Sequence, residues 1–162
     1  MYANTTAAMM QKTGQRLYTI GEAADLIGVS VPTIRMYERE GLIIPIRKDS
    51  RHRLFAESDL ERIRSIRKTI GTEKVSIAGI RRLMSLVPCW KLNNCDPEEV
   101  ARCGRMAAQD SPCWMVSGKD WKAKSDQCRS CGVYVRTSDY TQIRAVLQEF
   151  GVDARTESDV KA

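Results

Sequence analysis

The chain has 162 residues, 43% hydrophobic and 28% charged, enough for a packed core in one ordinary domain or two small ones. Its apolar runs are too short to cross a bilayer and no export signal opens it, so we expect a cytoplasmic protein with no membrane partner. The net charge of +6 lies entirely in residues 1–88, with 15 Lys+Arg against 9 Asp+Glu, whereas residues 89–162 hold 11 of each, so the first half is expected to bind a polyanion.

Two short helices are predicted after a polar, unpatterned arm of residues 1–16, which we expect to be disordered. Thr19 followed by Glu22 has the spacing of a capping box, in which hydroxyl and carboxylate satisfy free N–H groups of the first turn. Gly28 ends this helix, and Ser30 is a suitable N-cap for the next. Together the two segments predict a helix-turn-helix.

The second helix runs from Ser30 to a left-handed stop at Gly41 and carries hydrogen-bond donors suited to DNA. Donors on a rigid helix reach phosphates and base edges in the major groove. The donors are Thr33, Arg35, Tyr37 and Arg39. Alone, this segment would more simply be a solvated surface helix, and its neighbours favour DNA binding instead.

Residues 43–47 and 53–55 are two short apolar runs on either side of a polar, basic turn. They predict a small hairpin, or wing, whose arginines reach phosphates beside the groove. His52, the only histidine, lies on this turn and away from every cysteine, so we expect a phosphate contact or a surface position rather than a metal ligand.

Two further helices are predicted over residues 60–70 and after Ser76, because apolar residues recur there at helical spacing. Basic residues occupy the other faces of the first of these helices, and we expect them to be solvated. They are Arg62, Arg64, Arg67 and Lys68.

Four motifs stand in this order: Tyr-Thr-Ile-Gly-Glu-Ala-Ala at 18–24, Thr-Ile-Arg-Met-Tyr-Glu-Arg-Glu-Gly-Leu at 33–42, Arg-Leu-Phe at 53–55 and Val-Ser-Ile-Ala-Gly-Ile-Arg-Arg-Leu at 75–83. Residues 17–87 thereby resemble the DNA-binding domain of the MerR family, and in particular its heat-shock repressor branch. The resemblance implies a winged helix-turn-helix that binds an inverted repeat in double-stranded operator DNA as a homodimer, with RNA polymerase as a further partner at the promoter.

Carried over position by position, the resemblance implies DNA contacts by Thr33, Arg35 and Tyr37 of the second helix and by Arg47, Arg51 and Arg53 of the wing. The full set of predicted DNA-binding residues adds Thr19, Met36, Arg39 and His52. Met36 departs from the family pattern, because many members have tyrosine there, and this leaves one base contact open.

All six cysteines follow Pro88, which interrupts the helical pattern. They are Cys89, Cys95, Cys103, Cys113, Cys128 and Cys131. Without an export signal, this usage favours metal or redox chemistry over structural disulfides. We therefore interpret residues 88–135 as a sensor module.

Three interpretations of the cysteines remain open: a bound metal or cluster, a reversible disulfide, and inert buried thiols. We favour the first, because four thiolates suffice for tetrahedral Zn or for an iron–sulfur cluster. The adjacent Trp90 and Trp114 would exclude water, which favours the cluster. The preferred ligands are Cys89, Cys113, Cys128 and Cys131, with other sets and a six-thiolate site left open.

The same segment resembles the two-CW domain, a small bacterial cysteine-rich module. The resemblance rests on two Cys-Trp pairs, on the closing C-x-x-C and on Tyr134 after it. It implies a metal or redox role without naming the ligand.

Residues 136–151 predict an amphipathic helix with Asp139 as its cap, which buries its apolar face against the cysteine module or against a second copy of the chain. Residues 152–162 are expected to be a flexible tail. The expected fold is mainly α, and the expected function is a redox- or metal-sensing transcription regulator. The alternatives are a regulator with a purely structural zinc site and a thiol-disulfide oxidoreductase, which we do not favour because no thioredoxin-like βαβ pattern surrounds the C-x-x-C pair.

Overall fold

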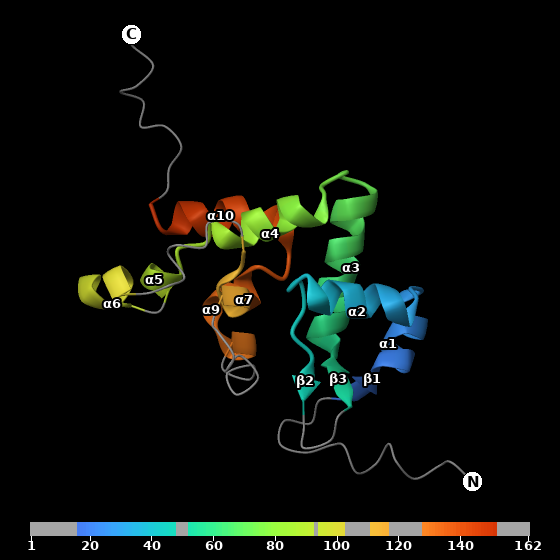
Figure 1. The fold of residues 1–162 in the computed structure, drawn as a ribbon. Helices are drawn as coiled ribbons and strands as arrows, with labels where there is room; N and C mark the ends of the chain where they lie inside the picture. Colours follow the sequence, from blue (N-terminus) through green and yellow to red (C-terminus); the bar gives the residue numbers. More distant parts are fainter. Residues whose placement is uncertain (1–15, 48–51, 93, 103–110, 117–127, 152–162) are drawn as a thin grey trace. The chain divides into compact units, whose positions relative to one another are not determined.

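The computed structural model describes residues 16–47, 52–92, 94–102, 111–116 and 128–151. Predictions for the N-terminal arm before Arg16, for Arg51, for Cys103 and for the tail lie outside the described residues. The chain forms two compact units, Met1–Ile77 and Ala78–Ala162. The described part is mainly helical with one small sheet, as predicted (Figure 1). None of the helices in this part has the length and apolar character needed to cross a membrane.

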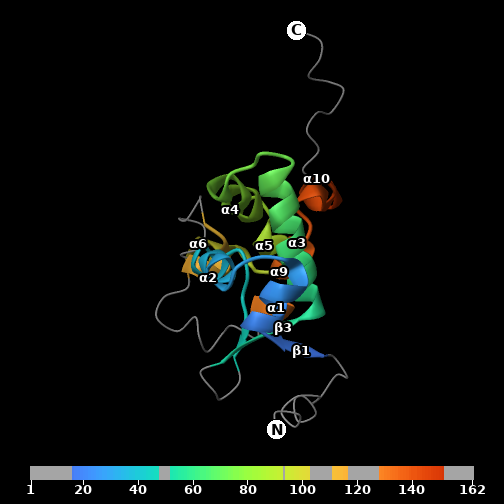
Figure 2. The same cartoon turned by 90° about the vertical axis from the view of Figure 1, so that its right-hand side faces the viewer.

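The first unit is a helix-turn-helix with a three-stranded antiparallel sheet. Its elements are β1 (Leu17–Thr19), α1 (Ile20–Ile27), α2 (Val31–Arg39), β2 (Ile46–Arg47), β3 (Arg53–Ala56) and α3 (Glu57–Gly71). The predicted hairpin is present as β2 and β3, with Arg47 opposite Arg53. Figures 1 and 2 show the strands gathered at one end of the unit, with α3 leading away from them.

Strand β1 was not predicted from the sequence. It pairs with β3, with Tyr18 opposite Phe55, and gives the sheet the order β1-β3-β2. A segment of three residues shows no reliable alternation, so only its pairing with a strand 36 residues later in the chain defines it.

Helix α1 ends at Gly28 as predicted, and α2 also begins and ends as predicted. Ser30 Oγ accepts from Thr33 N–H at 3.3 Å at the start of α2. At its end Gly41 has a φ of 72°, and Leu42 N–H donates to Tyr37 O at 2.9 Å. This hydrogen-bond pattern is a Schellman motif, in which glycine takes the left-handed position without steric cost.

At the start of α1 the capping box is complete. Thr19 N–H and Thr19 Oγ1 donate to Glu22 Oε2 at 2.7 and 2.9 Å, and Glu22 N–H donates to Thr19 Oγ1 at 3.3 Å. The Thr19 backbone N–H, followed by its hydroxyl, lowers the pKa of Glu22 from its usual value of 4.5.

This cap predicts a pH-dependent contribution to stability. Because the pKa of Glu22 is lower in the folded than in the unfolded chain, the contribution is fully present above the unfolded pKa and is lost as pH falls through the folded value. We expect Glu22→Gln to lower the thermal midpoint at pH 7 and to match the wild type once the pH lies below the folded pKa of Glu22. Thermal melts across this pH range measure the difference, and a gap that persisted at low pH would contradict a carboxylate cap.

The core of the first unit is formed by the inner face of α3 against α1 and β3. Leu60, Ile63 and Ile66 of α3, Ile34 of α2 and Phe55 of β3 have no exposed surface. Full burial of such a side chain contributes about 1.5–3 kcal/mol. Helix α2 is therefore anchored in a well-packed core through Ile34.

The second unit consists of short helices. They are α4 (Ile77–Ser85), which begins at the last residue of the first unit, α5 (Cys89–Leu92), α6 (Pro97–Arg102), α7 (Cys113–Val116), α9 (Gly132–Arg136), η3 (Tyr140–Gln142) and α10 (Ile143–Glu149). The boundary between the units falls after Ile77, so α4 belongs to the second unit, whereas the sequence placed a domain boundary after Val87.

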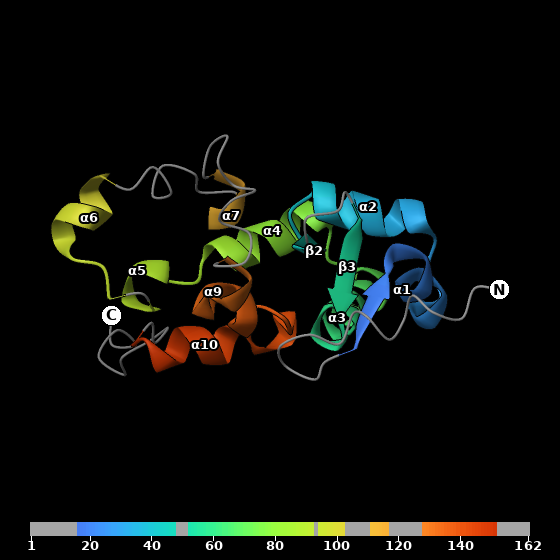
Figure 3. The same cartoon turned by 90° about the horizontal axis from the view of Figure 1, so that it is seen from below.

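The predicted C-terminal helix is divided into the 3-10 turn η3 and α10. It packs within the chain, because Ile143 and Val146 are buried and Lys91 Nζ donates to Phe150 O at 2.7 Å. Figure 3 shows α9 and α10 side by side, and Arg136 of α9 forms an ion pair with Glu149 of α10.

Candidate nucleic-acid interface and cysteine segment

The outer face of α2 presents Arg35, a long cation one helical turn before the exposed Arg39. Arg35 is exposed and makes no hydrogen bond or ion pair with another described residue. Thr33 and Met36 are half-buried, and Thr33 Oγ1 lies 2.8 Å from Ser30 Oγ. A five-donor guanidinium on a helix fixed at both ends is suited to a bidentate contact with a guanine edge.

Tyr37 lies on the opposite, inner side of α2. Only 5% of its surface is exposed, and burial raises the pKa of its phenol. The ring is thus part of the core, and its backbone carbonyl takes part in the helix stop described above. The sequence indicated that Tyr37 was a donor, but it did not show on which face of α2 the ring would lie.

The two described arginines of the wing, Arg47 and Arg53, do not extend freely into solvent. Arg47 Nη2 donates to Glu38 Oε1 and Arg53 Nε donates to Glu38 Oε2, each at 2.6 Å. Glu38, on the last turn of α2, was not among the predicted site residues. In the sequence Glu38 is one acidic residue near several arginines, and nothing in the local pattern shows which arginines it binds.

The remaining predicted DNA contacts are more exposed. The side chain of Arg39 is 72% exposed, and its Nε lies 3.9 Å from Glu40 Oε1, an ion pair that contributes little. His52 is exposed at the start of the wing's second strand. Thr19 serves as the cap of α1, and Arg51 lies outside the described residues.

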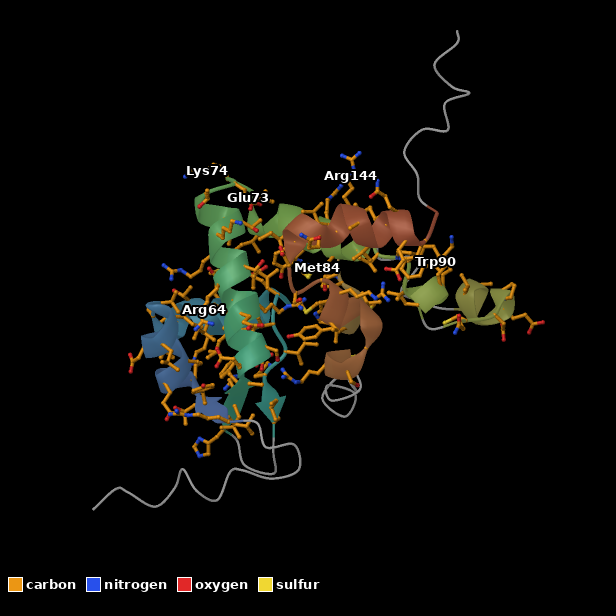
Figure 4. The ribbon with its side chains drawn as sticks, turned by 180° about the vertical axis from the view of Figure 1, so that it is seen from behind. Arg64, Glu73, Lys74, Met84, Trp90 and Arg144 are labelled. Atoms are coloured by element: carbon orange, nitrogen blue, oxygen red, sulfur yellow. The ribbon has the colours of Figure 1, made fainter. Side chains whose placement is uncertain are left out.

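Two arginines of α3 donate hydrogen bonds to the helix-turn-helix. The burial of one of them, Arg62, corrects the expectation that the basic residues of this helix are solvated. Arg62 is 1% exposed, and its Nε donates to Leu42 O at 2.8 Å, just after α2 ends. Arg67 Nη1 donates to Ile27 O, the last carbonyl of α1, at 2.7 Å. Arg64, Arg67 and Lys68 are exposed as expected, and Figure 4 labels Arg64 on α3.

In the second unit, the helical turns that carry cysteines meet at α9. Cys131 is the N-cap of α9, and its N–H donates to Cys128 O at 3.2 Å. Cys89 opens α5, which contacts α9, and Cys113 opens α7. Cys95 is exposed beyond the end of α5.

Aromatic and aliphatic contacts hold these helices on α9. The rings of Trp114 and Tyr134 meet edge to face with centroids 5.2 Å apart, a geometry favoured by their quadrupoles. A Cβ added at Gly132 would lie 3.5 Å from Leu92 Cδ2, so α5 and α9 approach closely there. Trp90, half-buried on α5, is labelled in Figure 4.

No disulfide joins the described cysteines, Cys89, Cys95, Cys113, Cys128 and Cys131, to one another. Across the described residues, no three Cys, His, Asp or Glu side chains gather as a group that could hold a metal ion. Cys103 lies outside these residues, so the six-cysteine set is not placed as a whole.

A search of protein-family models matches residues 18–86 to the MerR HTH family regulatory protein. Among curated proteins, the chain is 36% identical over 70 residues to a protein named as heat shock protein HspR of Streptomyces coelicolor, covering 43% of this chain and 46% of that one. It is 41% identical over 70 residues to the HTH-type transcriptional regulator MlrA of Escherichia coli, a match that covers 43% of this chain and 28% of that protein. It is 37% identical over 73 residues to the HTH-type transcriptional regulator ZntR of the same organism, with 43% and 50% covered.

The chain therefore spans about half the length of these relatives or less. No solved structure matches the chain.

Proposed function

We propose that the chain, whose residues 18–86 match the MerR family of helix-turn-helix regulatory proteins, is a transcription regulator that recognises one sequence in double-stranded DNA through α2. The observation that carries the proposal is Arg35, an exposed guanidinium without a partner among the described residues, on a helix whose two ends and inner face are fixed. The charge distribution agrees, because the excess positive charge lies in this half of the chain.

The proposed target is an inverted repeat bound by a homodimer, with RNA polymerase as a neighbour on the promoter. One helix of nine residues contacts only a few base pairs, so two copies are needed for a useful specificity ratio. The relatives named as transcriptional regulators support only the broader assignment of the chain as a transcription regulator.

The test is selection from a pool of random-sequence duplexes with the full chain, followed by competition between the enriched duplex and the unselected pool. We expect a palindromic consensus, a preference of about a thousandfold or more, and binding that weakens steeply with salt. If no duplex were enriched even at low ionic strength, the chain would not be a sequence-specific DNA-binding protein.

We further propose that the cysteine segment binds an iron–sulfur cluster or Zn through thiolates and reports redox state or metal to the DNA-binding unit. The support is the packing of α5 and α7 on α9, because the helices that begin at Cys89 and Cys113 contact the helix that follows Cys128 and Cys131. These are the four cysteines preferred on sequence grounds. The described side chains do not themselves form a group of three metal ligands.

Anaerobic purification with metal and acid-labile sulfide analysis and a visible spectrum tests this second proposal. We expect iron with sulfide and a visible absorption band, or else stoichiometric zinc. If metal is present, the loaded and stripped proteins should bind the selected duplex differently, and identical binding would reduce the site to a structural staple. Bare thiols in the anaerobic protein would contradict metal binding altogether.

A further inference from the structure

The carboxylate of Glu38 binds both strands of the wing to α2. Both oxygens of Glu38 are used, one by Arg47 of β2 and the other by Arg53 of β3, at 2.6 Å each. The Glu38 side chain is 11% exposed, and those of Arg47 and Arg53 are 30% and 33% exposed. Charge-assisted bonds at this degree of shielding are stronger than surface ion pairs, so this contact fixes the wing against the end of α2.

The same contact reduces the charge that the wing offers to DNA. Two guanidinium groups and one carboxylate carry +1 instead of +2. Each phosphate neutralised by a protein cation adds a term to affinity that is independent of sequence and falls with salt. Glu38 therefore removes roughly one such term while it sets the orientation of the wing.

From this geometry we infer that Glu38 is a specificity-determining residue, which lowers affinity for DNA of any sequence and at the same time positions the wing so that α2 reads one sequence. The inference rests on the proposed DNA-binding function and goes beyond it. A residue that was only structural would lower binding to every duplex when removed, and one that only repelled phosphate would raise binding to every duplex. A residue that both positions the wing and compensates charge predicts opposite changes when it is removed. Affinity for random DNA should rise, and the preference for the selected duplex should fall.

The test is Glu38→Gln in the full chain, which keeps the shape of the side chain and removes its charge. Dissociation constants are measured by fluorescence anisotropy for the selected duplex and for a random-sequence duplex over a salt series. For the random duplex we expect binding about fivefold to tenfold tighter near 0.1 M salt, and a log–log salt slope steeper by about 0.9 for each copy of the chain that contacts the duplex. The advantage of the selected duplex over the random one should fall about tenfold, the equivalent of one lost base contact.

Glu40→Gln is the matched control, because it removes the same charge two residues further on, where Glu40 Oε1 lies 3.9 Å from Arg39 Nε. It should leave the specificity ratio unchanged. If Glu40→Gln reproduced the effects of Glu38→Gln, net charge would explain them and the inference would be overturned.

The double variant Glu38→Gln with Arg53→Gln separates the two roles. It restores the net charge of the cluster, so the salt slope on random DNA should return to the wild-type value while the specificity ratio stays low. Recovery of both quantities would leave no positioning role for Glu38. Weaker binding of Glu38→Gln to the random duplex, or a melting midpoint below the assay temperature, would likewise overturn the inference.

These outcomes are distinct from failure of the proposed function. If the wild-type chain prefers no duplex, DNA recognition itself fails, and with it the premise of this inference. If the wild type is selective and only the Glu38 variants behave otherwise than expected, DNA recognition stands and the inference alone is wrong.

Discussion

Arg35→Ala is expected to abolish the preference of the protein for its selected duplex at about 0.15 M salt. The substitution removes the exposed guanidinium on the outer face of α2. This guanidinium binds no other described residue, so its loss breaks no contact within that part of the chain. Loss of a bidentate base contact costs about 1–3 kcal/mol for each half of a dimer, and the two losses add across a palindromic site. Competition between selected and random duplexes measures the effect directly.

Arg64→Ala is the control for this result. It removes the same kind of cation from the exposed surface of α3, where Arg64 Nη1 lies 3.3 Å from Glu57 Oε1. We expect a small, sequence-independent change, since an exposed pair of this kind is worth under about 1 kcal/mol. An equal loss of preference in both variants would mean that Arg35 contributes general charge rather than base recognition.

Arg62→Ala is expected to destabilise the first unit by about 3 kcal/mol, the largest effect on folding that we predict. Arg62 is nearly fully buried, and its Nε donates to the carbonyl of Leu42, directly after the glycine that stops α2. Alanine would leave a cavity and a buried carbonyl without this donor. A loss of this size should lower the thermal midpoint by more than about 10 °C, followed by far-UV circular dichroism of the full chain.

The same Arg64→Ala variant serves as the stability control. Because Arg64 is exposed, its removal should change the midpoint by only a degree or two. A midpoint for Arg62→Ala equal to that of Arg64→Ala would show that the buried hydrogen bond contributes nothing to stability.

The predictions from sequence that the structure confirms concern interactions between near neighbours in the chain. The capping box at Thr19, the Ser30 cap and the Gly41 stop each join residues three to five positions apart. Such bonds depend on local dihedral angles and on which side chain follows which, so the order of residues is enough to predict them. The apolar periodicity of α3 is equally local, and Leu60, Ile63 and Ile66 are buried as it required.

Functional assignments that depend on direction or on distant partners could not be predicted in this way. The helical pattern of α2 identified its donors, but burial against the core decided that Arg35 faces outward and Tyr37 inward. A run of basic residues on α3 suggested solvated faces, yet Arg62 is buried because a carbonyl 20 residues earlier accepts its hydrogen bond.

For this protein the sequence by itself determined the helices of the first unit, their caps, the hairpin and the family model that residues 18–86 match, because short-range geometry and residue order carry that information. Only the tertiary structure decided that β1 joins the sheet, that Glu38 binds two wing arginines, and that α5 and α7 meet α9. The physical reason is the same in each case: these contacts join segments that the path of the folded chain brings together, and no local preference of either segment encodes its partner.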